Sequence, residues 1–452
     1  MARAPLTSDT SLKAGEAKQT FATFVQSIEA YLSSRIQLGV ALLAGLAAAP
    51  AYAQFAVKPA PVSNLSVPFE RWLAEGNRKE IPWRLELSQP RLRPEQRIGF
   101  AVHATIPGKH LAGLEPGRNI YLGARIRDEQ GQWLGHNVVG ALLDKQLPQT
   151  AALSLMLRFY IQPGDYHVAV FLYDDASQEH SFATRRLRVR PLRNDPLAGS
   201  DANLPRVEAA PPESGLDALY QPRITSRPAW PVVTKRPLRI EVIAVATGTE
   251  GASPSSRNYA VSALKVLSQM DLDNGTLHVT VLDISRRKLL FEQENVRSLD
   301  WTGLRTVLED VDPATISIQA LQGSKEAPAF FRHAALNKLR NRISPDRSPA
   351  SSGNGASVAA VEPLRILIVV SSALHFEGGA DLTPVPAEAC GACRVYFLRQ
   401  FSWAARTSNP WHYGPDQLEQ LLKPLSPRTF TIYFPEDFRR ALGQILKDLR
   451  QY

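Results

Sequence analysis

The chain has 452 residues, of which 44% are apolar and 21% are charged, the balance of an ordinary globular protein with room for two or three domains. Its 52 Lys and Arg residues exceed its 43 Asp and Glu residues by a formal net charge of +9, an excess too dilute over this length to predict a nucleic-acid partner. With two cysteines, no disulfide framework can hold the fold together.

An apolar run near the N-terminus predicts an export signal. Residues 36–50 (IQLGVALLAGLAAAP) follow Arg35 and are too short to span a bilayer comfortably. Small residues then occupy both positions that a signal peptidase reads, so we expect cleavage between Ala53 and Gln54, with an uncleaved anchor as the alternative. The expected mature protein is exported to the periplasm, the cell surface or the medium, and it meets a membrane only through the signal segment before cleavage.

Residues 54–190 have the pattern of an all-β domain. Apolar and polar side chains alternate at Trp83–Leu87 and Ile98–Ile106, the period of half-buried strands. Further strands are expected at 120–126, 153–160, 166–173 and 182–189, between turns rich in Gly, Pro and Asp. Short strands at these intervals predict a sandwich, and Pro163-Gly164-Asp165-Tyr166 resembles the late hairpin of immunoglobulin-like domains.

The last expected strand of this domain is strongly basic. In Arg185–Arg190 (RRLRVR), Leu187 and Val189 are expected to point inward and the arginines that alternate with them outward. The simplest interpretation is a solvated face that protects a sheet edge. The alternative is an anionic surface partner, such as a polymer of the cell envelope.

A Pro-rich segment without hydrophobic period, residues 191–236, predicts an extended linker. The α/β domain then begins with Leu238–Glu250 (LRIEVIAVATGTE), whose near-continuous apolar run is typical of a strand buried on both faces of a parallel sheet. The run ends at Thr247-Gly248-Thr249, where an open α/β sheet usually places its ligand.

Strands and helices alternate through the rest of the chain. Strands are expected at 276–284, 288–293, 315–321, 364–371, 394–398 and 429–434, and helices at 257–270, 301–308, 326–343, 415–425 and 435–449. The gap between the strands at 276–284 and 288–293 is so short that this pair must be antiparallel. Residues 344–362 have the composition of a mobile, low-complexity loop. The closing helix begins at Pro435 and is clearly amphipathic, which favours packing on the sheet over a membrane or partner helix.

This order of elements resembles the von Willebrand factor type A fold, an open, Rossmann-like sheet with helices on both faces. Cys393–Leu398, Asn409-Pro410-Trp411 and Thr429–Pro435, followed by the closing helix, are similar to a branch of secreted bacterial proteins in which such a domain follows a β-rich region. The expected fold is therefore multidomain: an N-terminal all-β immunoglobulin-like sandwich at 54–190 and a C-terminal α/β open-sheet domain, von Willebrand factor A-like, at 237–452.

The resemblance also implies a cation site, from which this sequence departs. Metal-binding members of that family carry Asp-x-Ser-x-Ser after the first strand and an aspartate after the strand matched by Leu364–Ser371, because Mg²⁺ needs hard oxygen ligands. Here the two loops read ATGTE from Ala246 and SSALH from Ser371, without either aspartate. We expect no metal ligands and no cofactor, with Glu250 as a substitute ligand the alternative. The side chains that would line the same crevice are Thr247, Thr249, Ser371 and Ser372.

Cys390-Gly391-Ala392-Cys393 is a CxxC motif, and in an exported protein a local disulfide is its expected state. A thioredoxin-like redox role needs this motif at a helix N-terminus after a strand, whereas here it precedes a strand. Structural zinc needs two further ligands, for which His375 and His412 are candidates by proximity alone.

Catalytic motifs are missing from the sequence. There is no G-x-S-x-G, no Walker loop and no GxGxxG, and a dyad of Ser371 or Ser372 with His375 is less simple than packing and capping roles for these groups. We expect no catalytic residue. The predicted function is an exported, non-enzymatic binding or scaffold protein that contacts an unidentified protein partner at the envelope or outside the cell. The alternative is an extracytoplasmic thiol–disulfide oxidoreductase that uses Cys390 and Cys393.

Overall fold

A computed structural model of the protein describes residues 58–63, 65–210, 227–247, 254–309, 324–340, 362–372, 374, 376, 380–401 and 416–452. The predicted cleavage site at Ala53 and Gln54, the predicted strand 315–321 and nearly all of the predicted loop 344–362 lie outside these residues. Within them the protein is rich in β-structure, with several sheets and few helices. No helix in the described ranges combines the length and apolar character needed to cross a membrane.

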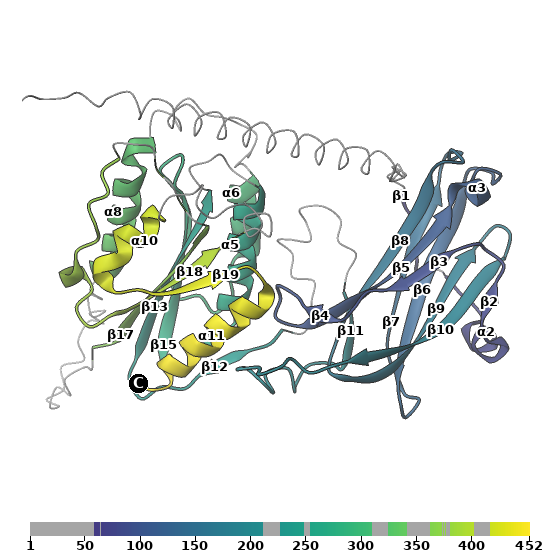
Figure 1. The fold of residues 1–452 in the computed structure, drawn as a ribbon, viewed down its shortest axis with the longest axis horizontal. Helices are drawn as coiled ribbons and strands as arrows, with labels where there is room; N and C mark the ends of the chain where they lie inside the picture. Colours follow the sequence, from purple (N-terminus) through teal and green to yellow (C-terminus); the bar gives the residue numbers. More distant parts are fainter. Residues whose placement is uncertain are drawn as a thin grey trace, which may run out of the picture.

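The described chain forms two units that lie side by side (Figure 1). Residues 58–210 form the β unit and residues 227–452 the α/β unit. The strands of the β unit are β1 (Lys58–Pro59), β2 (Arg78–Lys79), β3 (Arg84–Leu87), β4 (Arg91–Leu92), β5 (Ile98–Pro107), β6 (Arg118–Asp128), β7 (Trp133–Leu143), β8 (Ala152–Ile161), β9 (Gly164–Asp174), β10 (His180–Val189) and β11 (Val207–Ala210), and its helices are α2 (Phe69–Glu75) and α3 (Gly108–Leu111).

Two antiparallel sheets of the β unit enclose one apolar core. One sheet has the order β1-β7-β6-β9-β10-β2, and the other has the order β11-β8-β5-β3 with β4 beside β5. Because side chains alternate along a strand, every second residue reaches this core. Phe100 of β5, Leu122 of β6 and Val170 of β9 are all fully buried in it.

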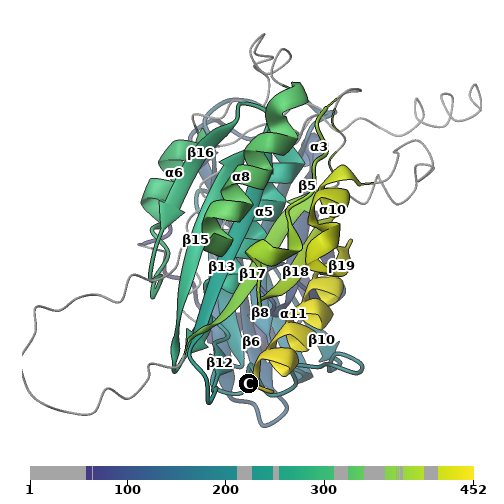
Figure 2. The same cartoon turned by 90° about the vertical axis from the view of Figure 1, so that its left-hand side faces the viewer.

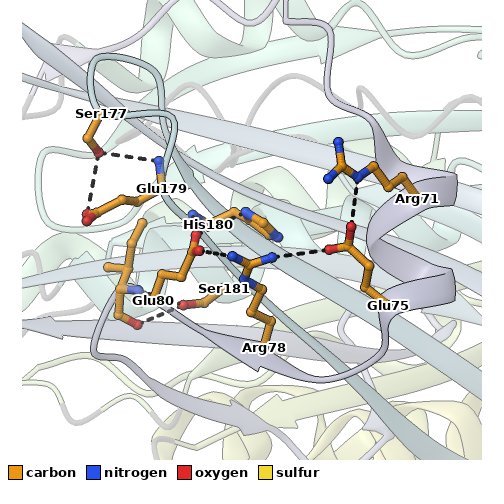
Figure 3. A network of polar contacts seen from close by, with 9 residues as sticks. Arg71, Glu75, Arg78, Glu80, Ser177, Glu179, His180 and Ser181 are labelled. Atoms are coloured by element: carbon orange, nitrogen blue, oxygen red, sulfur yellow. Dashed lines mark hydrogen bonds and ion pairs between the residues drawn. The ribbon is translucent and has the colours of Figure 1, made fainter.

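A short helix covers part of the outer face of the six-stranded sheet. Phe69 and Trp72 of α2 are buried against Phe171 and Phe182, with ring centroids 5.6 Å apart for Phe69 and Phe182 and 5.7 Å apart for Trp72 and Phe171. The chain after α2 is held by polar contacts to β10 (Figure 3).

The segment 191–236 differs from the extended linker that its composition predicts. Residues 207–210 form β11, which pairs with β8, and β12 (Trp230–Val232) pairs in parallel with β14 (Met270–Leu272). The reason is burial: Val207 and Trp230 each have an exposed fraction below 5%, and Val207 belongs to the core of the β unit whereas Trp230 belongs to that of the α/β unit. The described parts of the segment are therefore integrated into both units.

The α/β unit is built on a second six-stranded sheet. Its strands are β13 (Leu238–Thr247), β15 (Gly275–Asp283), β16 (Lys288–Gln293), β17 (Leu364–Ser372), β18 (Arg394–Gln400) and β19 (Arg428–Ile432), in the order β16-β15-β13-β17-β18-β19. All neighbours are parallel except β15 and β16, whose short connection requires the antiparallel arrangement found here. The chain forms one half of the sheet outward from β13, through β15 to β16, and then the other half outward from β17, through β18 to β19. The strand order therefore reverses between β13 and β17.

Helices cover both faces of this parallel sheet. They are α5 (Pro254–Leu267), α6 (Trp301–Glu309), α8 (Ala327–Arg340), α10 (Gln417–Leu422) and α11 (Pro435–Leu449), with short 3₁₀ turns at Ser324–Glu326, Ala387–Ala389 and Lys423–Leu425. The cores on the two faces separate α5, α6 and α11 from α8 and α10. Figure 2 shows α8 and α11 running alongside the strands. Burial on both faces explains why β13 and β17 read as continuous apolar runs.

One buried arginine joins the two units. Arg439 of α11 donates two hydrogen bonds to the carboxylate of Asp195, at 2.7 and 2.9 Å, and others to the carbonyl oxygens of Gln96 and Leu197 at 3.0 and 3.1 Å. Its exposed fraction is 3%. Burial raises the pKa of Asp195, but the hydrogen bonds from Arg439 and from the backbone N–H of Leu197 outweigh it, so the pKa lies below its ordinary value.

A glycine on the same helix allows this close approach. A Cβ at Gly443 would lie 2.6 Å from Cβ of Pro196, which is too close for any other residue unless the chain moves. A glycine inside a helix costs about 1 kcal/mol relative to alanine. Here it lets the segment around Asp195 lie directly on the backbone of α11, one turn after Arg439.

Replacing Arg439 by Met is expected to destabilise the protein by about 3–5 kcal/mol, because it leaves the carboxylate of Asp195, which is only 12% exposed, without its cation. Arg440→Gln on the same helix is the control, since the side chain of Arg440 is 69% exposed and its partner Asp437 keeps the hydrogen bonds that it accepts from the backbone N–H groups of Tyr433 and Phe434. Differential scanning calorimetry compares the three proteins. A transition temperature of Arg439→Met equal to that of the control would contradict the role of Arg439.

Candidate functional site

The carboxyl edge of the parallel sheet is split between β13 and β17. These strands pair in register only as far as Ala244 and Val370. Beyond that point Thr247 is paired with Asp283 of β15, whereas Ser371 and Ser372 are paired with Arg399 and Gln400 of β18. In open α/β sheets, the crevice at the reversal of strand order is where ligands bind. We call this split, together with the side chains around it, the edge crevice.

Two of the residues predicted for this crevice are described with their side chains. Ser371 has an exposed fraction of 1%, and its Oγ donates a hydrogen bond to the carbonyl oxygen of Ser372 at 2.8 Å. Ser372 is half-buried beside it. The strand β13 brings the backbone of Thr247 to the same edge, but its side chain and all of Thr249 lie outside the described part, as do Glu250 and His375.

Asp416, which the sequence analysis did not single out, is buried beside the edge crevice. Its Oδ1 accepts hydrogen bonds from the backbone N–H of Leu418 at 3.0 Å and of Leu374 at 3.4 Å. It is therefore the N-cap of α10 and also fastens the chain that leaves β17. The sequence carried a signal for the capping role, because Asp416 precedes an apolar run and Glu419 follows three residues later.

Burial dominates the titration of Asp416. It raises the pKa of this carboxyl above its ordinary value, and the N–H of Leu374, the charge of Arg399 and the N–H of Leu418 offset only part of the rise. The Nη1 of Arg399 lies 3.9 Å from Oδ2 of Asp416 and 2.9 Å from Oε2 of Glu419. Oδ1 of Asp416 is thus committed to backbone N–H groups, whereas its Oδ2 is buried without a hydrogen-bond partner among the described residues.

Two further polar side chains end strands at this edge. Asp283 is fully buried, and its Oδ1 accepts hydrogen bonds from Ser285 Oγ at 2.7 Å and from the backbone N–H of Arg286 at 2.9 Å. Gln400 has an exposed fraction of 5%, and its Oε1 has no hydrogen-bond partner among the described residues. Neither residue was predicted, because only the sheet register brings these strand ends together.

The chemistry of the edge crevice is that of hydrogen bonding. It offers two serine hydroxyls and an amide, and one oxygen of each of its carboxylates, Asp283 and Asp416, serves a turn or a helix cap. Among the residues that the structure describes, no group of three His, Cys, Asp or Glu side chains is arranged to hold a metal ion. Ser371 Oγ faces a carbonyl oxygen, which accepts its proton in a hydrogen bond but cannot act as a general base.

The CxxC motif lies at the opposite, amino edge of the sheet. Cys390 and Cys393 form a disulfide with their Cα atoms 5.1 Å apart, in the turn that leads into β18. Gly391 takes a φ of +57° there, a conformation that glycine adopts without strain. Both cysteines line a cavity of about 360 Å³. Its charged lining residues are Arg236, Arg340, Glu362, Arg365 and Glu388.

No family model matches the chain, and no curated protein matches it. Three solved structures share parts of it at low similarity. A Bordetella pertussis protein described as ApaA has 16% identity and a TM-score of 0.18, over 25% of this chain and 98% of that one. The C-terminal domain of wzt has 13% identity and a TM-score of 0.16, over 26% and 83%. A family 123 glycoside hydrolase from Clostridium perfringens has 7% identity and a TM-score of 0.22, over 77% and 72%. Likeness at this level carries no argument about function.

Asp416→Asn is expected to keep the free energy of unfolding within about 0.5 kcal/mol, because asparagine is an equally good N-cap, whereas Asp416→Ala is expected to lower it by about 1–2 kcal/mol. The two variants separate the acceptor from the charge. Since the folded pKa of Asp416 is raised, the wild-type free energy of unfolding should fall as the pH rises from 3.8 through the folded value.

Chemical unfolding at a series of pH values measures both effects. The Asn variant should lack this part of the pH dependence. Equal losses in the Asn and Ala variants would show that the charge of Asp416, and not its acceptor geometry, stabilises the edge.

Proposed function

We propose that this protein is an exported, non-enzymatic binding protein that recognises a protein partner through the edge crevice. In this proposal the α/β unit is a von Willebrand factor A-like domain without its cation site, and the β unit is an immunoglobulin-like sandwich. The proposed location rests on the signal pattern that ends at Ala53 and Gln54. The proposed contact is between two proteins and involves neither a nucleic acid nor a cofactor.

The topology supports the proposed kinship. Numbered along the chain, the strands follow the order 3-2-1-4-5-6, the arrangement of open doubly wound sheets. The third strand, β16, is antiparallel, as expected from the order of elements that resembles the von Willebrand factor type A fold. The match is one of connectivity, and the substitution of hydroxyls for the family's aspartates sets this chain apart.

The observation that carries the proposal is the early end of the pairing between β13 and β17. Strands that pair to their ends close the edge of a sheet, whereas these two part after Ala244 and Val370. Two of the buried groups near the split, Ser371 and Gln400, are donors and acceptors without a charge. A partner that seats a polar side chain against these two groups gains hydrogen bonds without having to desolvate an ion there.

A photoreactive benzoylphenylalanine at Ser372 is expected to crosslink a discrete partner in the cells that make the protein. The control position is Leu289 of β16, which is 46% exposed and lies at the far edge of the same sheet. The crosslink should persist in EDTA, because the proposed contact needs no cation. Absence of a product at Ser372, or identical products at both positions, would contradict binding through the edge crevice.

A second candidate function is thiol–disulfide exchange, favoured by one observation. The disulfide of Cys390 and Cys393 lines a cavity that also holds guanidinium groups, and nearby positive charge stabilises a thiolate. Two of these groups are already engaged: Arg365 donates to the carbonyl oxygen of Leu339 at 2.6 Å, and Arg236 donates to that of Glu362 at 2.8 Å. The turn position before β18, away from a helix N-terminus, weakens this candidate.

Replacing Cys390 and Cys393 together by serine separates the two functions. The binding proposal predicts that the Ser372 crosslink survives and that the melting temperature falls, because a local disulfide stabilises by limiting the unfolded chain. The oxidoreductase alternative predicts loss of turnover in an insulin-reduction or scrambled-disulfide assay. Measurable turnover of the wild-type protein that the double variant lacks would favour the enzyme.

A further inference from the structure

The β unit has a sheet edge that is covered for only part of its length. β10 pairs with β9 along all ten residues, from His180 to Val189. On its other side β2 pairs with Ser181 and Phe182 alone. Within the described chain, the remaining stretch of β10, Arg185–Val189, is therefore an edge strand, here named the arginine edge.

The part of β10 that β2 covers makes several hydrogen bonds with the chain at residues 78–81. Figure 3 shows Arg78 between Glu75 and Glu80, and Glu80 at His180. The carboxylate of Glu80 accepts a hydrogen bond from the backbone N–H of His180 at 2.8 Å, and Ser181 Oγ donates to the carbonyl oxygen of Ile81 at 2.8 Å. These contacts end where β2 ends, so they do not extend over the arginine edge.

The backbone of the arginine edge presents hydrogen-bonding groups outward. In an antiparallel pair, alternate residues direct both N–H and C=O away from the partner strand. His180 does so, since its carbonyl oxygen accepts from the N–H of Glu80, and Thr184 does so, since its N–H donates to Asn77 Oδ1 at 3.0 Å. The same alternation, unbroken in register, turns the backbone groups of Arg186 and Arg188 outward.

Positive charge accompanies these backbone groups. Arg185, Arg186 and Arg188 are exposed, and the side chain of Arg188 is 75% exposed and only 3.8 Å from its one neighbouring acid, Asp165. The register also sets Arg186 beside His167, and His167 beside Arg127, so no acid stands opposite Arg186 on the neighbouring strand.

We propose that the arginine edge binds an extended, acidic peptide segment of a partner protein as an added strand. The partner's backbone would pair with Arg186 and Arg188, and carboxylates two residues apart would meet their guanidinium groups, which bind carboxylates in a bidentate manner. Two copies of this edge would bring arginine against arginine, so the charge that prevents self-pairing selects an acidic strand. A sulfated or phosphorylated glycan would use the charge but not the backbone groups.

The test uses the full chain and a fluorescein-labelled octapeptide of alternating Glu and Thr, with binding followed by fluorescence anisotropy. Arg186→Gln/Arg188→Gln is expected to raise Kd at least about tenfold, since two charge-assisted pairs are lost. The matched control is Arg84→Gln/Arg91→Gln, which removes two exposed arginines from the other sheet. Its Kd should stay within about twofold of wild type.

A second peptide isolates the backbone. Methylation of the peptide's amide nitrogens on the paired side keeps all carboxylates but removes the donors, and it should abolish binding. Equal affinity of the methylated peptide, equal weakening in both double variants, or no binding of the octapeptide would overturn the proposal. Binding of a heparin fragment with the same dependence on Arg186 and Arg188, while the octapeptide fails to bind, would assign the surface to polyanions instead.

Discussion

The contact between the guanidinium of Arg439 and the carboxylate of Asp195 determines how the two units of this protein are held. The guanidinium is withdrawn from water, and its donors find acceptors in both oxygens of Asp195 and in the carbonyl oxygens of Gln96 and Leu197. The helix that carries Arg439 also closes one face of the parallel sheet through Leu442 and other apolar residues. The core of one unit and its attachment to the other are therefore built by the same element.

The edge crevice follows from a different constraint, the order of the parallel strands. In a sheet that winds outward from two central strands, here β13 and β17, the connections after these strands run to opposite faces, whatever side chains the strands carry. The side chains then decide what the opening can do. Here one oxygen of each nearby carboxylate, Asp283 and Asp416, accepts hydrogen bonds from local backbone groups, and the buried Ser371 and Gln400 add uncharged donors and acceptors.

Sequence patterns predicted the elements whose signals are local. The apolar runs of β13 and β17 and the amphipathic α11 were found at nearly their observed positions, because burial on two faces or on one helical stripe leaves a clear period. Short elements such as β11 and β12 were missed, since three or four residues have no period and their partners β8 and β14 lie far away in sequence. The roles of Gln400 and Asp416 were missed for a related reason: their neighbours at the crevice are set by sheet register and by the loop after β17.

The absent side chain of Gly443 has a consequence for recognising relatives of this protein. Within α11, Arg439 and Gly443 stand one turn apart on the same stripe: the first reaches Asp195, and the second leaves space for Pro196. Glycine is unfavourable inside a helix, so an Arg-x-x-x-Gly spacing in a closing amphipathic helix would indicate this contact between the two units. Chains whose β-rich halves have diverged beyond detection would still reveal, by those two positions, that they are assembled in the same way.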